Sequence, residues 1–125
     1  MDGVIITSAN RAKLSACTVA DTLRRFWPVE ETGIKGRFVV EGCGSRVYFE
    51  NDCDPNEPDR IQLVLEHSMG LNLIKKILEI IADDPEFVID NEFSTVLRGD
   101  AFVARLRADP DWDWRADYLR AEGLI

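Results

Sequence analysis

Apolar residues recur at two different spacings along the chain, and these spacings predict where strands and helices lie. The β-branched run at residues 4–7 predicts a short buried strand. Between residues 10 and 27, apolar side chains return at every third or fourth position, which is typical of an amphipathic helix. Pro28 ends this helix because proline lacks a backbone donor.

Two runs rich in β-forming residues and one alternating run then predict three consecutive strands. The runs at residues 37–41 and 46–50 flank Gly42-Cys43-Gly44-Ser45, a pattern that predicts a hairpin with a four-residue turn. Ile61, Leu63 and Leu65 stand at every second position and predict a third strand over residues 61–66. Phe38 and Val40 would share one face, as would Val47 and Phe49, which suits a sheet that is covered on one side.

Helical spacing returns in the second half of the chain. Residues 70–82 form the clearest predicted helix, and its broad apolar surface makes it the expected centre of the packing. A short strand pair is predicted at 87–89 and 95–97, across an acidic turn. Two further helices follow, one with Asp100 as its N-cap and one over residues 111–122.

The predicted order is therefore β-α-β-β-β-α-β-β-α-α. Three strands in a row favour a mainly antiparallel sheet with helices packed on one face. We expect a single α+β domain over residues 1–125, because the sequence has neither repeats nor a long linker.

Composition narrows the function classes. The chain has 125 residues, of which 46% are apolar and 30% charged. A chain of this size can bury a hydrophobic core without disulfide bonds or metal ions to stabilise it. Its longest apolar-rich stretch, residues 71–82, is much shorter than the ~20 residues of a membrane span. Without a signal sequence, the three cysteines are expected to be reduced, and we expect a cytoplasmic protein.

The formal net charge is −8, and it is clustered. Residues 51–59, 83–92 and 109–117 carry net charges of −4, −5 and −3. Acidic surfaces repel phosphate backbones, so nucleic-acid binding is disfavoured. A basic protein is the natural complement of such a surface.

Candidate catalytic and metal-binding groups are few. Residues 52–56 resemble the opening of a calcium loop, but Glu57 and Leu63 stand where glycine and glutamate are required, which favours a solvated acidic loop. Cys43, Cys53 and His67 are spaced unlike the ligands of a structural zinc site. Nucleotide-binding and common hydrolase motifs are absent from the sequence. We therefore expect no metal and no cofactor.

Trp112 and Trp114 are interleaved with aspartates in the most unusual segment of the chain. On one helix, residues two apart point about 200° from each other, so one indole could be an exposed interface anchor. Alternatively, a bend at the start of the helix lets both rings cover the end of the sheet.

Three functional hypotheses follow. The leading one is a small acidic protein-binding module that docks a basic protein partner, in an inhibitor, antitoxin or immunity-type role. The alternative is a small enzyme or ligand-binding subunit that uses Cys43, His67 and nearby carboxylates. A third is a homo-oligomer joined through the last strand pair or the aromatic tail. The predicted partner-binding residues are Asp83, Asp84, Asp90, Glu92, Asp111, Trp112, Asp113 and Trp114.

Overall fold

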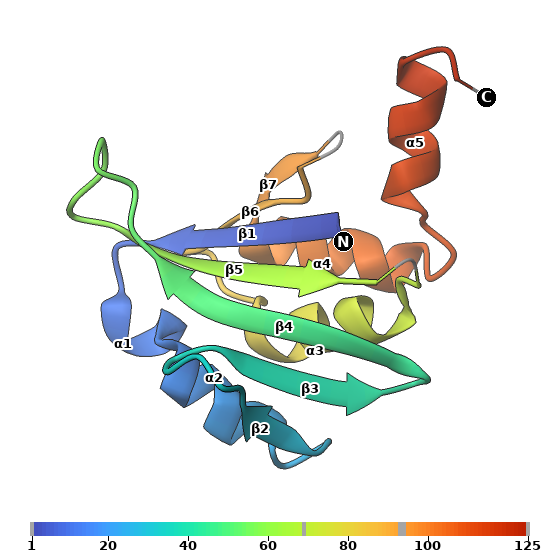
Figure 1. The fold of residues 1–125 in the computed structure, drawn as a ribbon. Coiled ribbons are helices and arrows are strands. Elements are labelled where there is room, and N and C mark those ends of the chain that lie inside the picture. The colour runs from blue at the N-terminus through green and yellow to red at the C-terminus, as the bar shows by residue number, and fades with distance from the viewer. Residues whose placement is uncertain (1, 69, 93–94, 125) are drawn as a thin grey trace.

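A seven-stranded antiparallel sheet forms the body of the protein in a computed structural model that describes residues 2–68, 70–92 and 95–124 (Figure 1). The strands are β1 (Asp2–Ser8), β2 (Val29–Glu31), β3 (Phe38–Gly42), β4 (Ser45–Asp52), β5 (Ile61–His67), β6 (Val88–Asp90) and β7 (Val96–Arg98). The helices are α1 (Arg11–Leu14), α2 (Ala16–Leu23), α3 (Asn72–Ile81), α4 (Gly99–Ala108) and α5 (Trp114–Ala121). This confirms the predicted α+β class and the mainly antiparallel sheet.

The sheet has the order β2-β3-β4-β5-β1-β6-β7, so the first strand of the chain lies inside it. Ile6 of β1 is paired with Leu63 of β5 on one side and with Ile89 of β6 on the other. Helices α1 to α4 lie together on one side of the sheet, whereas α5 projects beyond its edge (Figure 1).

The core lies between the sheet and these four helices. Alternate strand residues such as Val4, Ile6, Leu63 and Leu65 are fully buried, as the alternation predicted. From α3, the side chains of Leu73, Ile74, Ile77 and Leu78 are fully buried against them. The helix predicted to be central is therefore central.

The single helix predicted over residues 10–27 is wrong, because the chain breaks at Ser15 into α1 and α2. Ser15 is extended, with φ −58° and ψ 132°. The side chain of Asn51 on β4 supplies the missing partners: its Oδ1 accepts from the Ala16 N–H at 2.8 Å and its Nδ2 donates to the Leu14 carbonyl at 2.9 Å. A long-range amide thus satisfies the backbone groups that the break leaves unpaired.

The predicted hairpin forms with a tighter turn than expected. β3 and β4 are joined by only two residues, Cys43 (φ 51°) and Gly44 (φ 72°), both in the left-handed region. Two consecutive positive φ values match the right-handed twist of the flanking strands. The sequence pattern also missed β2, a three-residue edge strand with only one buried side chain.

Helix starts in the last third also differ from the prediction. Arg98, not Asp100, is the N-cap residue of α4, and its side chain caps no N–H group. Asp100 lies inside the helix. The last helix begins only at Trp114, where the Asp113 side chain accepts from the N–H groups of Arg115 and Ala116.

Candidate functional site

One face of the sheet is left uncovered by α1 to α4, and we call it the open face (Figure 1). It is formed by the strand residues that alternate with the buried ones. They are Glu30, Val39, Glu41, Arg46, Tyr48, Glu50, Asp52, Gln62, Val64, Glu66, Ile5, Thr7, Asp90, Val88, Val96 and Arg98, together with Arg37 and Glu92 at strand ends.

Carboxylates outnumber guanidinium groups on the open face by seven to three. The three arginines are already neutralised, because Arg37 pairs with Glu50 and Glu66, Arg46 with Glu41, and Arg98 with Asp100. Within the described ranges, four carboxylates of this face form no ion pair. They are Glu30, Asp52, Asp90 and Glu92.

Arg37 organises the centre of the open face. Its guanidinium lies 5.0 Å from the centroid of the Tyr48 ring, 2.9 Å from Glu50 Oε1 and 3.5 Å from Glu66 Oε2. Burial disfavours the charged form of Arg37, but the hydrogen bonds and charges of Glu66 and Glu50 outweigh this and raise its pKa. The side chain is only 18% exposed, so this network is a fixed part of the surface.

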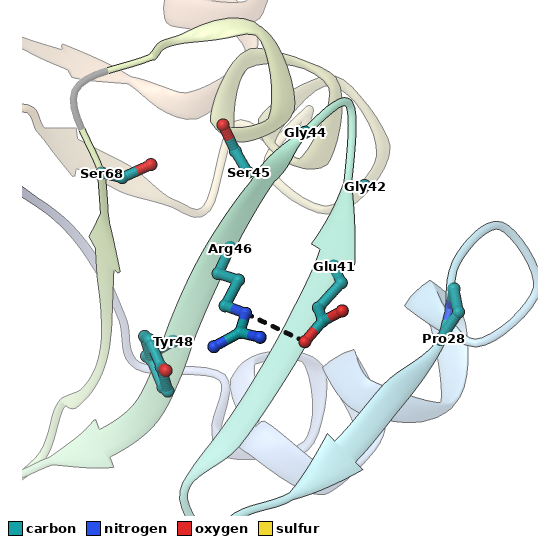
Figure 2. A pocket seen from close by; sticks show the side chains of 8 residues that line it. All are labelled: Pro28, Glu41, Gly42, Gly44, Ser45, Arg46, Tyr48 and Ser68. Carbon is teal, nitrogen blue, oxygen red and sulfur yellow. Dashed lines mark ion pairs between the residues drawn. The ribbon is translucent and has the colours of Figure 1, made fainter.

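A shallow hollow of about 780 Å³ lies at the hairpin end of the open face. Figure 2 shows Arg46 and Glu41 reaching toward each other from neighbouring strands, with Tyr48 beside them. The Arg46 Nε and Glu41 Oε1 atoms are 3.0 Å apart, and the hydroxyls of Ser45 and Ser68 line the hollow. This part of the face offers hydrogen-bonding groups, while its charges are mutually compensated.

Two strands across from the hollow, around the start of β1, the open face is acidic. A Cβ built on Gly3 would collide with the Glu92 carboxylate, so Glu92 lies directly over Gly3. The neighbouring residue, Asp2, pairs with Arg115 of α5 at 3.1 Å. The start of β1 therefore brings two of the three acidic stretches, residues 83–92 and 109–117, to the same end of the sheet.

Asp83 and Asp84, by contrast, do not reach the open face. Asp83 pairs with Arg107 of α4 at 3.1 Å, and Asp84 pairs with Lys13 of α1 at 2.9 Å. The hydrogen bond from Lys13 lowers the pKa of Asp84. Both carboxylates are engaged with the helices of the covered side, which separates them from the other predicted partner-binding residues.

The two tryptophans are buried, at 3% exposure for Trp112 and none for Trp114. Trp112 Nε1 donates to Asp117 Oδ2 at 2.7 Å, and the Arg105 guanidinium lies 3.7 Å from the centroid of its ring. Trp114 packs against Phe102 and His67. This corrects the interpretation in which one indole is an exposed anchor, whereas Asp111 and Asp113 beside them are exposed.

Cys43 and His67 are not joined by a hydrogen bond in the part of the chain that is described. Cys43 is exposed, and its Sγ lies 3.7 Å from Lys76 Nζ. His67 is buried, with Nδ1 2.9 Å from the Ser68 carbonyl oxygen, and burial lowers its pKa. Residues 2–68, 70–92 and 95–124 contain no group of three or more histidine, cysteine or acidic side chains able to hold a metal ion.

Sequence reasoning missed Tyr48, Glu50 and Glu66 as surface-forming residues. The signal was present, because they occupy the positions that alternate with buried residues in β4 and β5. What the pattern lacked was the register, which sets Tyr48 opposite Glu66 and Glu50 opposite Val64.

Comparison of this chain with models of protein families, with curated proteins and with solved structures gives no match. Among the described residues, no helix is both long enough and apolar enough to cross a membrane.

Proposed function

We propose that this protein is an acidic protein-binding domain that docks a basic protein partner on the open face of its sheet. The observation that carries the proposal is the excess of carboxylates on this face, four of which have no cationic partner among the described residues. Lysine or arginine side chains of a partner would neutralise these carboxylates. The negative electrostatic potential of the carboxylates would also attract such a partner before contact.

The apolar residues of the open face support the same function. Ile5, Val39, Val64 and Tyr48 are half-buried between the charged side chains, although no helix from α1 to α4 covers them. Protein interfaces combine an apolar centre with a polar rim in this way. A domain of this kind suits an inhibitor, antitoxin or immunity-type role, in which the activity is to bind a basic protein and block it.

The test is affinity capture from a lysate of the source cell with two variants of equal charge. The first, Glu30→Gln/Asp52→Asn/Asp90→Asn/Glu92→Gln, removes the unpaired carboxylates of the open face. Its control, Glu57→Gln/Asp59→Asn/Asp109→Asn/Glu122→Gln, removes four exposed carboxylates elsewhere. All eight substitutions keep the size of the side chain.

We expect the natural protein and the control variant to retain the same basic protein, which high salt releases. The open-face variant should lose it. Retention of no basic protein by the natural chain, or equal retention by both variants, contradicts the proposal.

A further inference from the structure

The two edges of the sheet differ in their protection. At the β2 edge, Arg24 Nε donates to the Val29 carbonyl at 3.4 Å, so a side chain of α2's C-cap residue covers an outward-facing backbone group. β7 forms the other edge. Uncovered edges are where another chain can add a strand.

The hydrogen bonds of β7 fix which of its backbone groups point outward. Asn91 N–H donates to the Thr95 carbonyl at 3.2 Å, and Gly99 N–H donates to the Phe87 carbonyl at 2.8 Å. Because antiparallel pairing alternates, Thr95, Leu97 and Gly99 face β6, whereas the N–H groups of Val96 and Arg98 face away from it. Among the described residues, no group bonds the outward N–H or carbonyl of Val96.

The side chains beside this edge form an apolar and acidic corner. Val96 is 62% exposed and Val88 is 38% exposed, and both lie on the open face. Asp90 is opposite Val96 in the pairing, and Glu92 follows it in the turn. Both carboxylates lack a cation in the described structure, because the nearby Arg98 is held by Asp100 at 2.6 Å and 2.9 Å.

We propose that the edge of β7 receives an extended basic segment of the partner as an added strand. Backbone hydrogen bonds to Val96 would give the segment its direction, and its apolar side chains would cover Val88 and Val96. Its lysine or arginine side chains would reach Asp90 and Glu92. This inference rests on the proposed function, since it names the part of the partner that the acidic surface takes.

The probe is the peptide Thr-Arg-Thr-Val-Thr-Arg-Thr-Val with blocked ends, called the arginine–valine peptide, in which arginine and valine occupy alternate positions and so share one face of the added strand. In its control each threonine is replaced by proline, so the control keeps the charge but cannot form a regular strand. Amide hydrogen exchange of the full chain reports on pairing directly. With the first peptide, exchange of the outward N–H groups of Val96 and Arg98 should slow by at least about tenfold, because they become hydrogen-bonded. The control peptide should not slow it.

A substitution in β7 separates strand addition from simple charge attraction. Val96→Pro removes only an outward N–H, so the pairing with β6 is kept, and edge strands tolerate proline. We expect it to weaken binding of the arginine–valine peptide by about tenfold, whereas Val96→Thr, which keeps the N–H, should change binding by less than about twofold. Should Val96→Pro fail to fold, Asp90→Asn/Glu92→Gln is the second variant and should weaken binding of the same peptide severalfold at low salt.

The outcomes are distinct. Peptide binding without slower exchange at Val96 and Arg98 overturns strand addition but leaves the acidic docking face standing, as does equal binding by a folded Val96→Pro variant. Absence of binding by the peptide also overturns strand addition. The proposed function is judged independently by the capture experiment with the open-face variant.

Discussion

His67 is a buried histidine whose two ring nitrogens have different surroundings. Its Nδ1 lies 2.9 Å from the Ser68 carbonyl, so Nδ1 carries the proton and donates it, whereas Nε2 has no partner among the described residues. Burial is the largest influence and lowers its pKa; Asp2 opposes this effect and Arg115 adds to it. The folded protein therefore holds His67 neutral.

This burial makes stability depend on pH. The unfolded chain protonates His67 near its ordinary pKa of about 6.5, whereas the folded chain does so only at lower pH, so acid favours unfolding. The contribution of neutral His67 to the free energy of unfolding is complete above pH 6.5. It is lost as the pH falls below 6.5, by up to about 1.4 kcal/mol per pH unit. Urea unfolding of the natural chain and of His67→Gln between pH 7.5 and 5 measures this. A pH slope that is the same in both would contradict it.

Cys43 offers a second prediction at the residue scale, which also tests the thiol-based alternative. The Lys76 ammonium lies 3.7 Å from its sulfur, so a dianionic disulfide reagent should be attracted to it. We expect Cys43 to react about fivefold faster than Cys17 or Cys53, the equivalent of a charge interaction near 1 kcal/mol in water. Single-cysteine variants measure the rates, and Lys76→Gln should remove the difference. Equal rates of reaction at Cys17, Cys43 and Cys53 would show that Cys43 is not unusually reactive.

At the scale of the elements, Gly99 is the point where α4 joins the rest of the fold. A Cβ at this position would collide with the carbonyl oxygens of Ala82 and Asp84, and its N–H donates to the Phe87 carbonyl. The end of α3, the start of β6 and the start of α4 thus meet backbone to backbone. Only glycine allows this approach.

Gly99→Ala should therefore destabilise the fold by about 1–3 kcal/mol, because the added methyl group has no space. Gly33→Ala is the matched control, since nothing lies within 4 Å of its Cβ position. The control should change the free energy of unfolding by less than about 0.5 kcal/mol. Thermal unfolding of both variants measures the difference, and equal midpoints would be the contrary result.

The elements also show how far the sequence predicts this protein. Helix α3 and the alternating strands were predictable, because their side-chain spacing is local information. The break at Ser15 was not, because the groups that satisfy it belong to Asn51, 35 residues beyond Ala16. The candidate site was also predictable only in part. The acidic runs of the sequence indicated Asp90 and Glu92, whereas only the strand register places Glu50 and Glu66 on the same surface.

On the scale of the whole molecule, one cluster of buried side chains connects both ends of the sheet. Val29 and Phe38 at the β2 end belong to the same cluster as Phe102, Trp112 and Trp114 at the other. A continuous core of this kind favours unfolding in one step.

We therefore expect far-ultraviolet circular dichroism and tryptophan fluorescence to report the same unfolding midpoint in urea. The tryptophans report on two separate regions of the fold. Trp27 packs beside Gly42, whereas Trp112 and Trp114 pack beside α4. Variants with single tryptophans would separate their signals. Two midpoints would mean that the α4–α5 end unfolds independently of the sheet.

The interior position of β1 has a consequence for biosynthesis. Of the seven strands of the sheet, β1 is synthesised first, and it pairs with β5 and β6, so both of its neighbours are synthesised long after it. At about 5–20 residues per second, an apolar strand with two unpaired edges waits for seconds before the chain reaches residue 90. During that time Ile5 and Ile6 lack the strands with which they pair in the folded sheet. A circular permutant that begins at α3 and joins residue 125 to residue 1 would make β6 before β1 and β5 last. It should accumulate with less dependence on chaperones.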